Sequence, residues 1–214
     1  MRRVITSLTL LLALAACGDD SSGGAPAVAL PQGCAAADGS SPQTRTFAEY
    51  PPICLTEGKG YTAVVETNQG TLHIDLYADT APLTVNSFVN LARFHYFDGT
   101  TCHRAIQFFV TQCGDPTATG GGGPGYEFAD ETAGQAPYAI GSVAMANAGP
   151  DTNGSQFFII TGDNGAMLDP NYTLFGEVQA DDLAVVVQLD SLGNPGDGAP
   201  LEPIDIIRVT IEEK

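Results

Sequence analysis

The side chains that most often perform covalent or metal chemistry are few in this chain and do not form the usual patterns. The three histidines, His73, His95 and His103, lack the spacing of metal ligands on one element. A C-x-x-C redox pair is absent, and the glycine run 120–123 is not followed by the Gly-Lys-Ser/Thr of a phosphate-binding loop. The sequence therefore predicts no metal site, no cofactor and no nucleotide-phosphate site.

The charge balance excludes one large class of partners. The 214 residues include 25 acidic and 8 basic side chains, for a formal net charge of −17. Nucleic-acid binding depends on a surplus of Lys and Arg against phosphates, so we expect no nucleic-acid partner. A hydrophobic content of 43% with 15% charged residues argues against global disorder. The length suits one domain of about 150 residues with extensions.

The N-terminus has the pattern of a secretory leader. Two arginines precede an apolar run from Val4 to Leu14, which ends in Leu-Ala-Ala-Cys17. That ending resembles the lipobox of bacterial lipoproteins, in which the cysteine receives a diacylglycerol. The alternatives are an ordinary signal peptide or a short membrane anchor. We expect 1–16 to be a lipoprotein signal peptide, and Cys17 to anchor the protein by lipid to a bacterial membrane, outside the cytoplasm.

Residues 17–58 are predicted to form a flexible membrane tether. The stretches 18–26 and 38–42 consist mostly of small, polar and proline residues, which is typical of linkers. The folded domain is then expected over 59–214.

Four further cysteines suit an oxidising compartment. Cys34, Cys54, Cys102 and Cys113 allow two disulfides in three connectivities. Cys102 and Cys113 flank an expected hairpin, which leaves Cys34 to pair with Cys54. Free thiols, or a redox or metal role, are the alternatives.

The expected elements are mostly short strands. Alternating apolar and polar residues predict a hairpin of 62–67 and 71–76. A hydroxyl cap and an early proline at 80–82 indicate a helix start, and apolar residues follow at helical spacing to about Arg93. The mainly β fold expected from eight strands and two helices is a closed antiparallel barrel capped by the helices. The remaining strands are expected at 102–106, 109–113, 141–147, 156–161, 172–178 and 204–212, and the second helix at 181–189.

Two segments carry a more specific pattern. C-H-R-A-I-Q-F-F-V-T-Q-C-G-D at 102–115 resembles the F-H-R-x-I-x-x-F-x-x-Q-G-G-D signature of cyclophilins. M-A-N-A-G-P-D-T-N-G-S-Q-F-F-I at 145–159 is similar to a second signature of that family almost letter for letter. The glycine-rich stretch 120–126, the acidic turn 128–131 and a later L-D…F-G element at 168–176 also match, with Pro170 in place of the usual Gly. The resemblance covers 61–214.

The resemblance implies an eight-stranded barrel with two helices and peptidyl-prolyl cis–trans isomerase activity on proline-containing polypeptides. Arg104 matches the family's catalytic arginine, whose permanent charge suits a role independent of protonation. Gln112 matches a residue that orients it, and Phe109 belongs to the proline pocket. The other residues implied in substrate binding are His103, Val110, Ala146, Asn147, Ala148, Gln156, Phe158, Met167, Leu168 and Tyr172.

Further positions depart from the family pattern, and Val110 replaces a family Met. Met167 replaces the Trp of many eukaryotic members and Tyr172 replaces their His, so we expect cyclosporin to bind weakly. Cys102 and Cys113 replace the usual Phe and Gly. If Gln107 and Phe108 form the turn, these two cysteines face each other across the hairpin, and a disulfide between them would connect the strands of the site.

The leading hypothesis is a monomeric isomerase that assists the folding of extracytoplasmic proteins. A proline-peptide binding module with weak catalysis is the main alternative, and a redox protein using Cys102 and Cys113 is a third.

Overall fold

The computed structural model describes residues 33–214, so the leader 1–16 and Cys17 lie outside the described residues. Short strands predominate in this part of the chain. The strands are β1 (Tyr61–Thr67), β2 (Gly70–Leu76), β3 (Thr100–Thr101), β4 (Arg104–Ile106), β5 (Val110–Cys113), β6 (Ser142–Met145), β7 (Phe157–Ile160), β8 (Leu174–Val178) and β9 (Asp205–Glu213). The helices are α1 (Pro82–Arg93), α2 (Asp163–Ala166), the 3₁₀ turn η1 (Ala180–Asp182) and α3 (Leu183–Ser191).

The first hairpin follows the alternation in the sequence. β1 and β2 pair antiparallel, with Val65 opposite Leu72. Leu72 and Ile74 are fully buried, whereas the Asp75 side chain between Ile74 and Leu76 is exposed. The turn closes at Gly70, whose φ of +137° suits glycine alone. The sequence prediction is confirmed here because the period of two places one face of β2 in the core.

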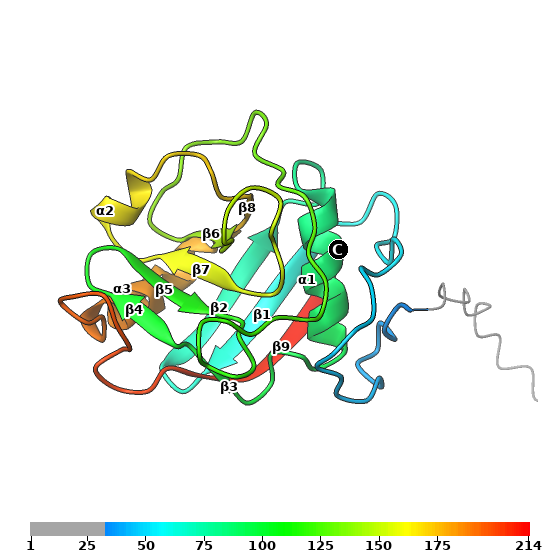
Figure 1. Cartoon of the computed structure of the whole chain (residues 1–214), viewed down its shortest axis with the longest axis horizontal. Coiled ribbons are helices and arrows are strands. Elements are labelled where there is room, and N and C mark those ends of the chain that lie inside the picture. The colour runs from blue at the N-terminus through cyan, green and yellow to red at the C-terminus, as the bar shows by residue number, and fades with distance from the viewer. Residues whose placement is uncertain (1–32) are drawn as a thin grey trace, which may run out of the picture.

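The nine strands form one curled sheet in the order β3-β9-β1-β2-β8-β6-β7-β5-β4, drawn in Figure 1. The closed eight-stranded barrel expected from the sequence is not confirmed, because the edge strands β3 and β4 do not pair with each other. Only Cys102 and His103 separate these strands in the chain. The Cys102 N–H donates to Ile204 O at 2.8 Å, which interrupts the single strand expected over 102–106. β3 pairs with β9, and β4 pairs with β5.

The main core lies between the sheet and α1. Phe88 on α1 packs against Phe97, Phe157 and Phe175, with ring centroids 5.0–5.5 Å apart. The helix starts at Pro82 as the sequence indicated, but the expected Thr80 hydroxyl does not cap it. The Glu131 carboxylate accepts the backbone N–H groups of Leu83 and Thr84 instead.

The second expected helix, 181–189, is present as η1 followed by α3, and α2 is an additional short helix. α3 contains the run Val185–Val187, whose β-branched residues lower helix propensity. Val186 and Leu189 are buried, so packing overrides that propensity. Among residues 33–214, no helix combines the length and the apolar character needed to cross a bilayer.

Residues 33–58, the described part of the expected tether, pack on the domain as an arm (Figure 1, blue to cyan). The side chain of Asn86 on α1 accepts the Cys54 N–H, and that of Asn90 accepts the Ala35 N–H. The bond Cys34–Cys54 joins the two ends of the arm. The structure differs from the prediction because polar α1 residues, which sequence patterns do not associate with distant segments, supply hydrogen bonds to the arm backbone.

His95 makes one of these arm contacts dependent on pH. Its Nε2 lies 2.9 Å from Gly39 O, and its Nδ1 lies 2.9 Å from Asp98 Oδ2. The bond to the Gly39 carbonyl and the bond to the Asp98 carboxylate together raise the pKa of His95. Both partners accept hydrogen bonds, so the doubly protonated ring fits the site best.

We predict that the arm stabilises the protein more in mild acid than in mild base. Because the folded-state pKa of His95 lies above the reference value of 6.5, its contribution is complete below that pH and is lost as pH rises through the folded-state pKa. The free energy of unfolding in urea should fall from about pH 6 to about pH 8 more for the wild type than for His95→Asn. Asparagine tolerates the φ of +54° at this position. Equal pH slopes for the two proteins would contradict the prediction.

Candidate active site

A row of residues crosses four strands on one face of the sheet. Arg104 on β4 lies opposite Gln112 on β5, which lies opposite Phe158 on β7. Phe158 in turn lies opposite Ala144 on β6. Directly opposed residues of paired strands project to the same side, so the cation, the amide and the aromatic ring share one face. Arg104, Gln112 and Phe158 are motif residues that the sequence singled out.

The Arg104 guanidinium is held from three directions. Its Nε donates to Asp197 Oδ1 at 2.7 Å, and its Nη2 donates to Asp197 Oδ2 at 3.3 Å. Its Nη1 donates to Gln112 Oε1 at 3.3 Å, and its Cζ lies 5.8 Å from the centroid of the Phe109 ring. The hydrogen bonds from Arg104 lower the pKa of Asp197. A forked ion pair of this kind restricts the orientation of the guanidinium plane.

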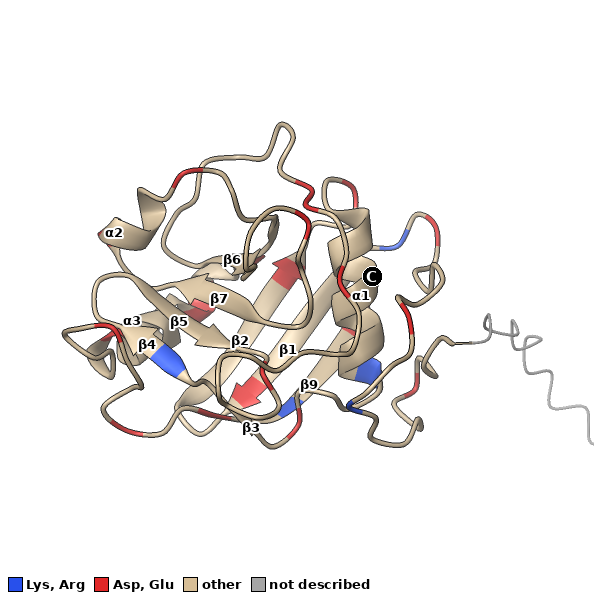
Figure 2. Cartoon of the chain, viewed as in Figure 1, with Lys and Arg blue, Asp and Glu red and all other residues tan. Residues whose placement is uncertain are grey.

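Figure 2 shows acidic residues in many parts of the ribbon and few basic ones. The basic residue on β4 is Arg104. Arg104 is therefore a local cation on a strongly acidic molecule.

A chain of amide hydrogen bonds leads from Arg104 to the glycine-rich loop 120–127. Gln112 Nε2 donates to Gln156 Oε1 at 3.0 Å. Gln156 Nε2 then donates to the carbonyls of Gly120 and Gly122, at 3.0 and 2.9 Å. Each amide uses its oxygen toward the arginine and its nitrogen toward the loop, so the guanidinium determines the direction of the whole chain.

Asp115 holds the beginning of the same loop. Its carboxylate accepts the backbone N–H groups of Thr117, Thr119, Gly120 and Gly122. Burial alone would raise the pKa of Asp115, but the hydrogen bonds from Thr117, Gly122 and Gly120 hold it well below its usual range. The loop is thus built around an ionised carboxylate.

The His103 ring lies beside the glycine-rich loop at Gly120. A Cβ placed on Gly120 would lie 3.6 Å from the His103 ring, and the buried His103 Nδ1 has no hydrogen-bond partner within residues 33–214. Burial lowers the pKa of His103; the Asp115 carboxylate opposes this shift, and Arg104 acts in the same direction as burial. The place of the ring beside the loop agrees with a packing role.

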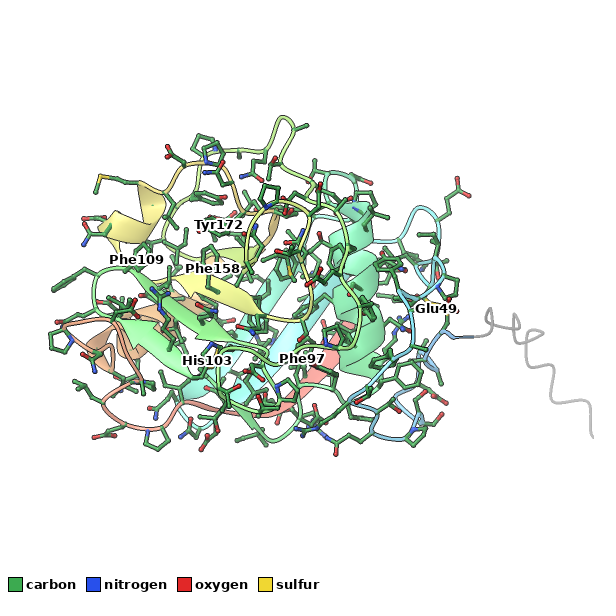
Figure 3. All side chains as sticks on the ribbon, in the orientation of Figure 1. Glu49, Phe97, His103, Phe109, Phe158 and Tyr172 are labelled. Atoms are coloured by element: carbon green, nitrogen blue, oxygen red, sulfur yellow. A yellow bond between two sulfur atoms is a disulfide. The ribbon has the colours of Figure 1, made fainter. Side chains whose placement is uncertain are left out.

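An apolar cluster lies next to the row. Val110 and Phe158 are buried, and the Phe158 and Tyr172 rings meet edge to face with centroids 5.4 Å apart. Phe109, Ala146 and Leu168 pack against the same cluster. Figure 3 shows Phe109, Phe158 and Tyr172 on one side of the molecule. Met167 is not part of the cluster, because it follows α2 and is 74% exposed.

A cleft of about 690 Å³ adjoins the row, between the loop 120–127 and the segment 146–156. Ala146, Asn147 and Ala148 line one side of it, together with Gln112 and Gln156. The Asn147 side chain donates to Asn171 O at 3.2 Å and to Asp130 Oδ1 at 3.4 Å, which holds this side in place.

The bond Cys102–Cys113 lies at one end of the β4–β5 hairpin, with Cα atoms 4.0 Å apart. The turn expected at Gln107 and Phe108 is one residue longer, because Ile106 pairs with Val110 and leaves three residues in the loop. Phe108 adopts a φ of +62° there. The predicted register was therefore wrong by one residue, and that shift places Arg104 opposite Gln112.

Comparison with known proteins decides the family. The family described as "Cyclophilin type peptidyl-prolyl cis-trans isomerase/CLD" matches residues 62–211. This chain is a cyclophilin. It belongs to the cyclophilin-type peptidyl-prolyl cis–trans isomerase family.

Two curated relatives come from Mycobacterium tuberculosis (strain ATCC 25618 / H37Rv). "Probable peptidyl-prolyl cis-trans isomerase B" is 43% identical over 159 residues, which are 67% of this cyclophilin and 51% of the relative, so the chain spans about half the length of that protein. "Peptidyl-prolyl cis-trans isomerase A" is 42% identical over 170 residues, with 70% of this chain and 91% of the relative covered.

Solved structures agree with the fold. A crystal structure of a Cryptosporidium parvum cyclophilin type peptidyl-prolyl cis–trans isomerase has a TM-score of 0.67 and 31% identity, covering 72% of this cyclophilin and 99% of that chain. A second structure of that protein, in the presence of the dipeptide Ala-Pro, has a TM-score of 0.66.

Three carboxylates of this cyclophilin site were not assigned roles from the sequence. Asp115 and Asp130 stand inside the matched motifs, so their positions were a signal that they matter. Asp197 lies in the loop between α3 and β9 and has no sequence signal, since only the fold brings this loop to β4. Among residues 33–214, no group of three or more His, Cys, Asp or Glu side chains is placed to hold a metal ion.

Proposed function

We propose that this cyclophilin catalyses rotation about Xaa–Pro peptide bonds at the face built around Arg104. The observation that carries the proposal is the position of Arg104, held by Asp197 and Gln112 at the border of the apolar cluster of Phe109 and Phe158. An apolar cluster suits a proline ring, and a fixed guanidinium beside it suits the proline nitrogen. Family membership supports the proposal.

The chemistry requires no nucleophile. Rotation about a peptide bond meets a barrier of about 18–20 kcal/mol because the amide is conjugated. In the twisted transition state the proline nitrogen regains a lone pair, and a donor aimed at it stabilises that state more than the planar ground state. An acceleration of about 10⁵-fold corresponds to roughly 7 kcal/mol of such differential stabilisation.

We predict that Arg104→Ala lowers kcat/KM by about 100-fold or more, a loss similar to that of removing one preorganised donor from an active site. NMR exchange spectroscopy on an Ala-Pro peptide measures the interconversion directly. Arg104→Lys should restore little of the lost kcat/KM. The lysine ammonium lacks the forked donors with which the guanidinium binds Asp197 and Gln112 at the same time. Arg208→Ala is the matched control, since Arg208 pairs with Glu66 on β1.

Two results would change the assignment. Peptide binding without accelerated exchange would favour the alternative, a proline-peptide binding module with weak catalysis. Exchange that Arg104→Ala leaves at the wild-type rate would overturn the assignment of the site. The redox alternative has no support, because Cys102 and Cys113 are both bonded and at most 2% exposed.

We propose further that the protein is a monomer held by a lipid on Cys17 to a bacterial membrane, where it assists the folding of extracytoplasmic chains. The lipobox-like sequence before Cys17 supports this, and the bonds Cys34–Cys54 and Cys102–Cys113 suit an oxidising compartment.

We expect Cys17→Ser to move the protein, expressed in a bacterium, from the membrane fraction to the soluble fraction, because the acyl chains supply the membrane affinity. Detergent phase partition followed by intact mass measures both location and lipid. Ser21→Ala, a few residues further on, is the control and should stay in the membrane fraction. Wild-type partition of Cys17→Ser would contradict lipid anchoring at this cysteine.

We propose that this cyclophilin binds cyclosporin more weakly than members with Trp at the position of Met167. Met167 supplies neither an indole donor nor a flat ring, and its side chain is exposed. Met167→Trp should tighten binding about tenfold, the value of roughly one good hydrogen bond with ring contact, as measured by calorimetry. Inhibition of the wild-type protein at low-nanomolar cyclosporin would contradict this.

A further inference from the structure

Two domain side chains, those of Asp115 and Gln156, hold the first half of the glycine-rich loop 120–127. The Asp115 carboxylate accepts the N–H groups of Gly120 and Gly122, and the Gln156 amide donates to the carbonyls of the same two glycines. The loop forms one side of the cleft beside Arg104. Its second half, from Gly123 to Glu127, has the hydrogen bond between Tyr126 and Ser87 Oγ on α1 and takes further support from another part of the chain.

The arm of residues 33–58 supplies that support. The Phe47 N–H donates to Pro124 O at 2.8 Å. The Phe47 carbonyl lies so close to Gly125 that a Cβ there would be 2.4 Å from it, and Gly125 has a φ of +103°. The arm backbone and the loop backbone are thus in direct contact, without intervening side chains, at a glycine that such an approach requires.

Aromatic side chains pack around the contact between Phe47 and the loop. The Phe47 ring packs on Phe94 and Tyr126, with centroids 5.4 and 6.3 Å apart. The Tyr50 ring meets Tyr126 edge to face at 5.6 Å. Tyr126 itself donates to or accepts from Ser87 Oγ on α1, at 2.9 Å. The end of the loop is therefore clamped between the arm and α1.

The arm is rigid enough to act in this way because it is anchored at both ends. Cys34 and Cys54 are bonded to each other. Asn90 accepts the Ala35 N–H beside the first cysteine, and Asn86 accepts the Cys54 N–H at the second. In the middle, the Thr44 N–H donates to Phe94 O at 2.9 Å. Both asparagine side chains are buried in α1, so the anchors are fixed to the core.

We propose that the arm is a positioning element of the substrate cleft. Phe47 holds Pro124 and Gly125 and so fixes the loop wall, which determines affinity for the part of a polypeptide that extends past the proline cluster into the cleft. The arm lies before residue 62, where the family match begins, so the support is an addition of this chain to the matched domain. The proposal rests on the assignment of the site around Arg104.

The test uses the full chain and two peptides of different length. The short peptide is acetyl-Ala-Pro-amide, and the long one carries three further alanines on each side. For Phe47→Ala we expect KM for the long peptide to rise about 5- to 10-fold, the size of a modest coupling between two sites, with kcat unchanged. The short peptide lacks the flanking residues that are proposed to reach the loop wall at Pro124 and Gly125, so its KM should not rise. This split between peptides is a readout that general loss of stability would not produce.

Two further variants sharpen the test. The double change Cys34→Ser with Cys54→Ser removes the bond that joins the two ends of the arm and should also raise KM for the long peptide. Glu49→Gln alters an exposed arm side chain two residues from Phe47 and should leave both peptides unchanged (Glu49 is labelled in Figure 3). In Phe47→Ala, the amide resonances of Gly120–Gly125 should shift. The amide resonances of the β-sheet residues should stay at their wild-type positions.

The outcomes separate this inference from the assignment on which it depends. Equal changes for the long and short peptides, or unchanged loop resonances, would overturn the role of the arm and leave the site intact. Exchange of the short peptide that does not depend on Arg104 would instead overturn the site itself.

Discussion

The register between β4 and β5 is the constraint on which the site depends. A three-residue loop with Phe108 in the left-handed region sets the pairing of Ile106 with Val110, and so of Arg104 with Gln112. A register slip of one residue would turn every β4 side chain to the other face of the sheet. Arg104 would then point away from Phe158, and the amide chain to the loop would lose its first donor. The disulfide Cys102–Cys113 joins the two strands at the open end of the same hairpin.

The register places Arg104 on this face, and an ion pair with Asp197 orients its guanidinium. The chain has a formal net charge of −17, yet the face beside the apolar cluster carries a fixed cation. Asp197 engages Arg104 through two donors and leaves Nη1 for Gln112, so the acid orients the cation while its own side chain stays 71% exposed. An ion pair this exposed contributes little to stability. Its importance is geometric, because the direction of the guanidinium sets the direction of both glutamine amides.

The loop 120–127 shows how an otherwise flexible glycine sequence becomes a defined wall. Glycines allow the close backbone approaches at Asp115 and at Phe47, but they lose more conformational entropy on ordering than any other residue. That cost is offset by the ionised Asp115, by Gln156 and by the arm. These three supports come from different parts of the chain, and all of them contact the loop.

Local pattern and motif were enough to place the first hairpin, α1 and the cluster of Phe109, Phe158 and Tyr172. These depend on periodicity and on side chains that lie within one or two strands of one another. The family motifs in the sequence indicated Phe109, Phe158 and the cation Arg104, but they also indicated Met167, which the structure leaves 74% exposed. Only the tertiary structure decided that 33–58 is an arm, that Asp197 meets Arg104 and that the sheet has two edges. The arm and the contact of Asp197 with Arg104 rest on hydrogen bonds between residues 32, 55 and 93 positions apart, made by polar side chains with no period to reveal their partners.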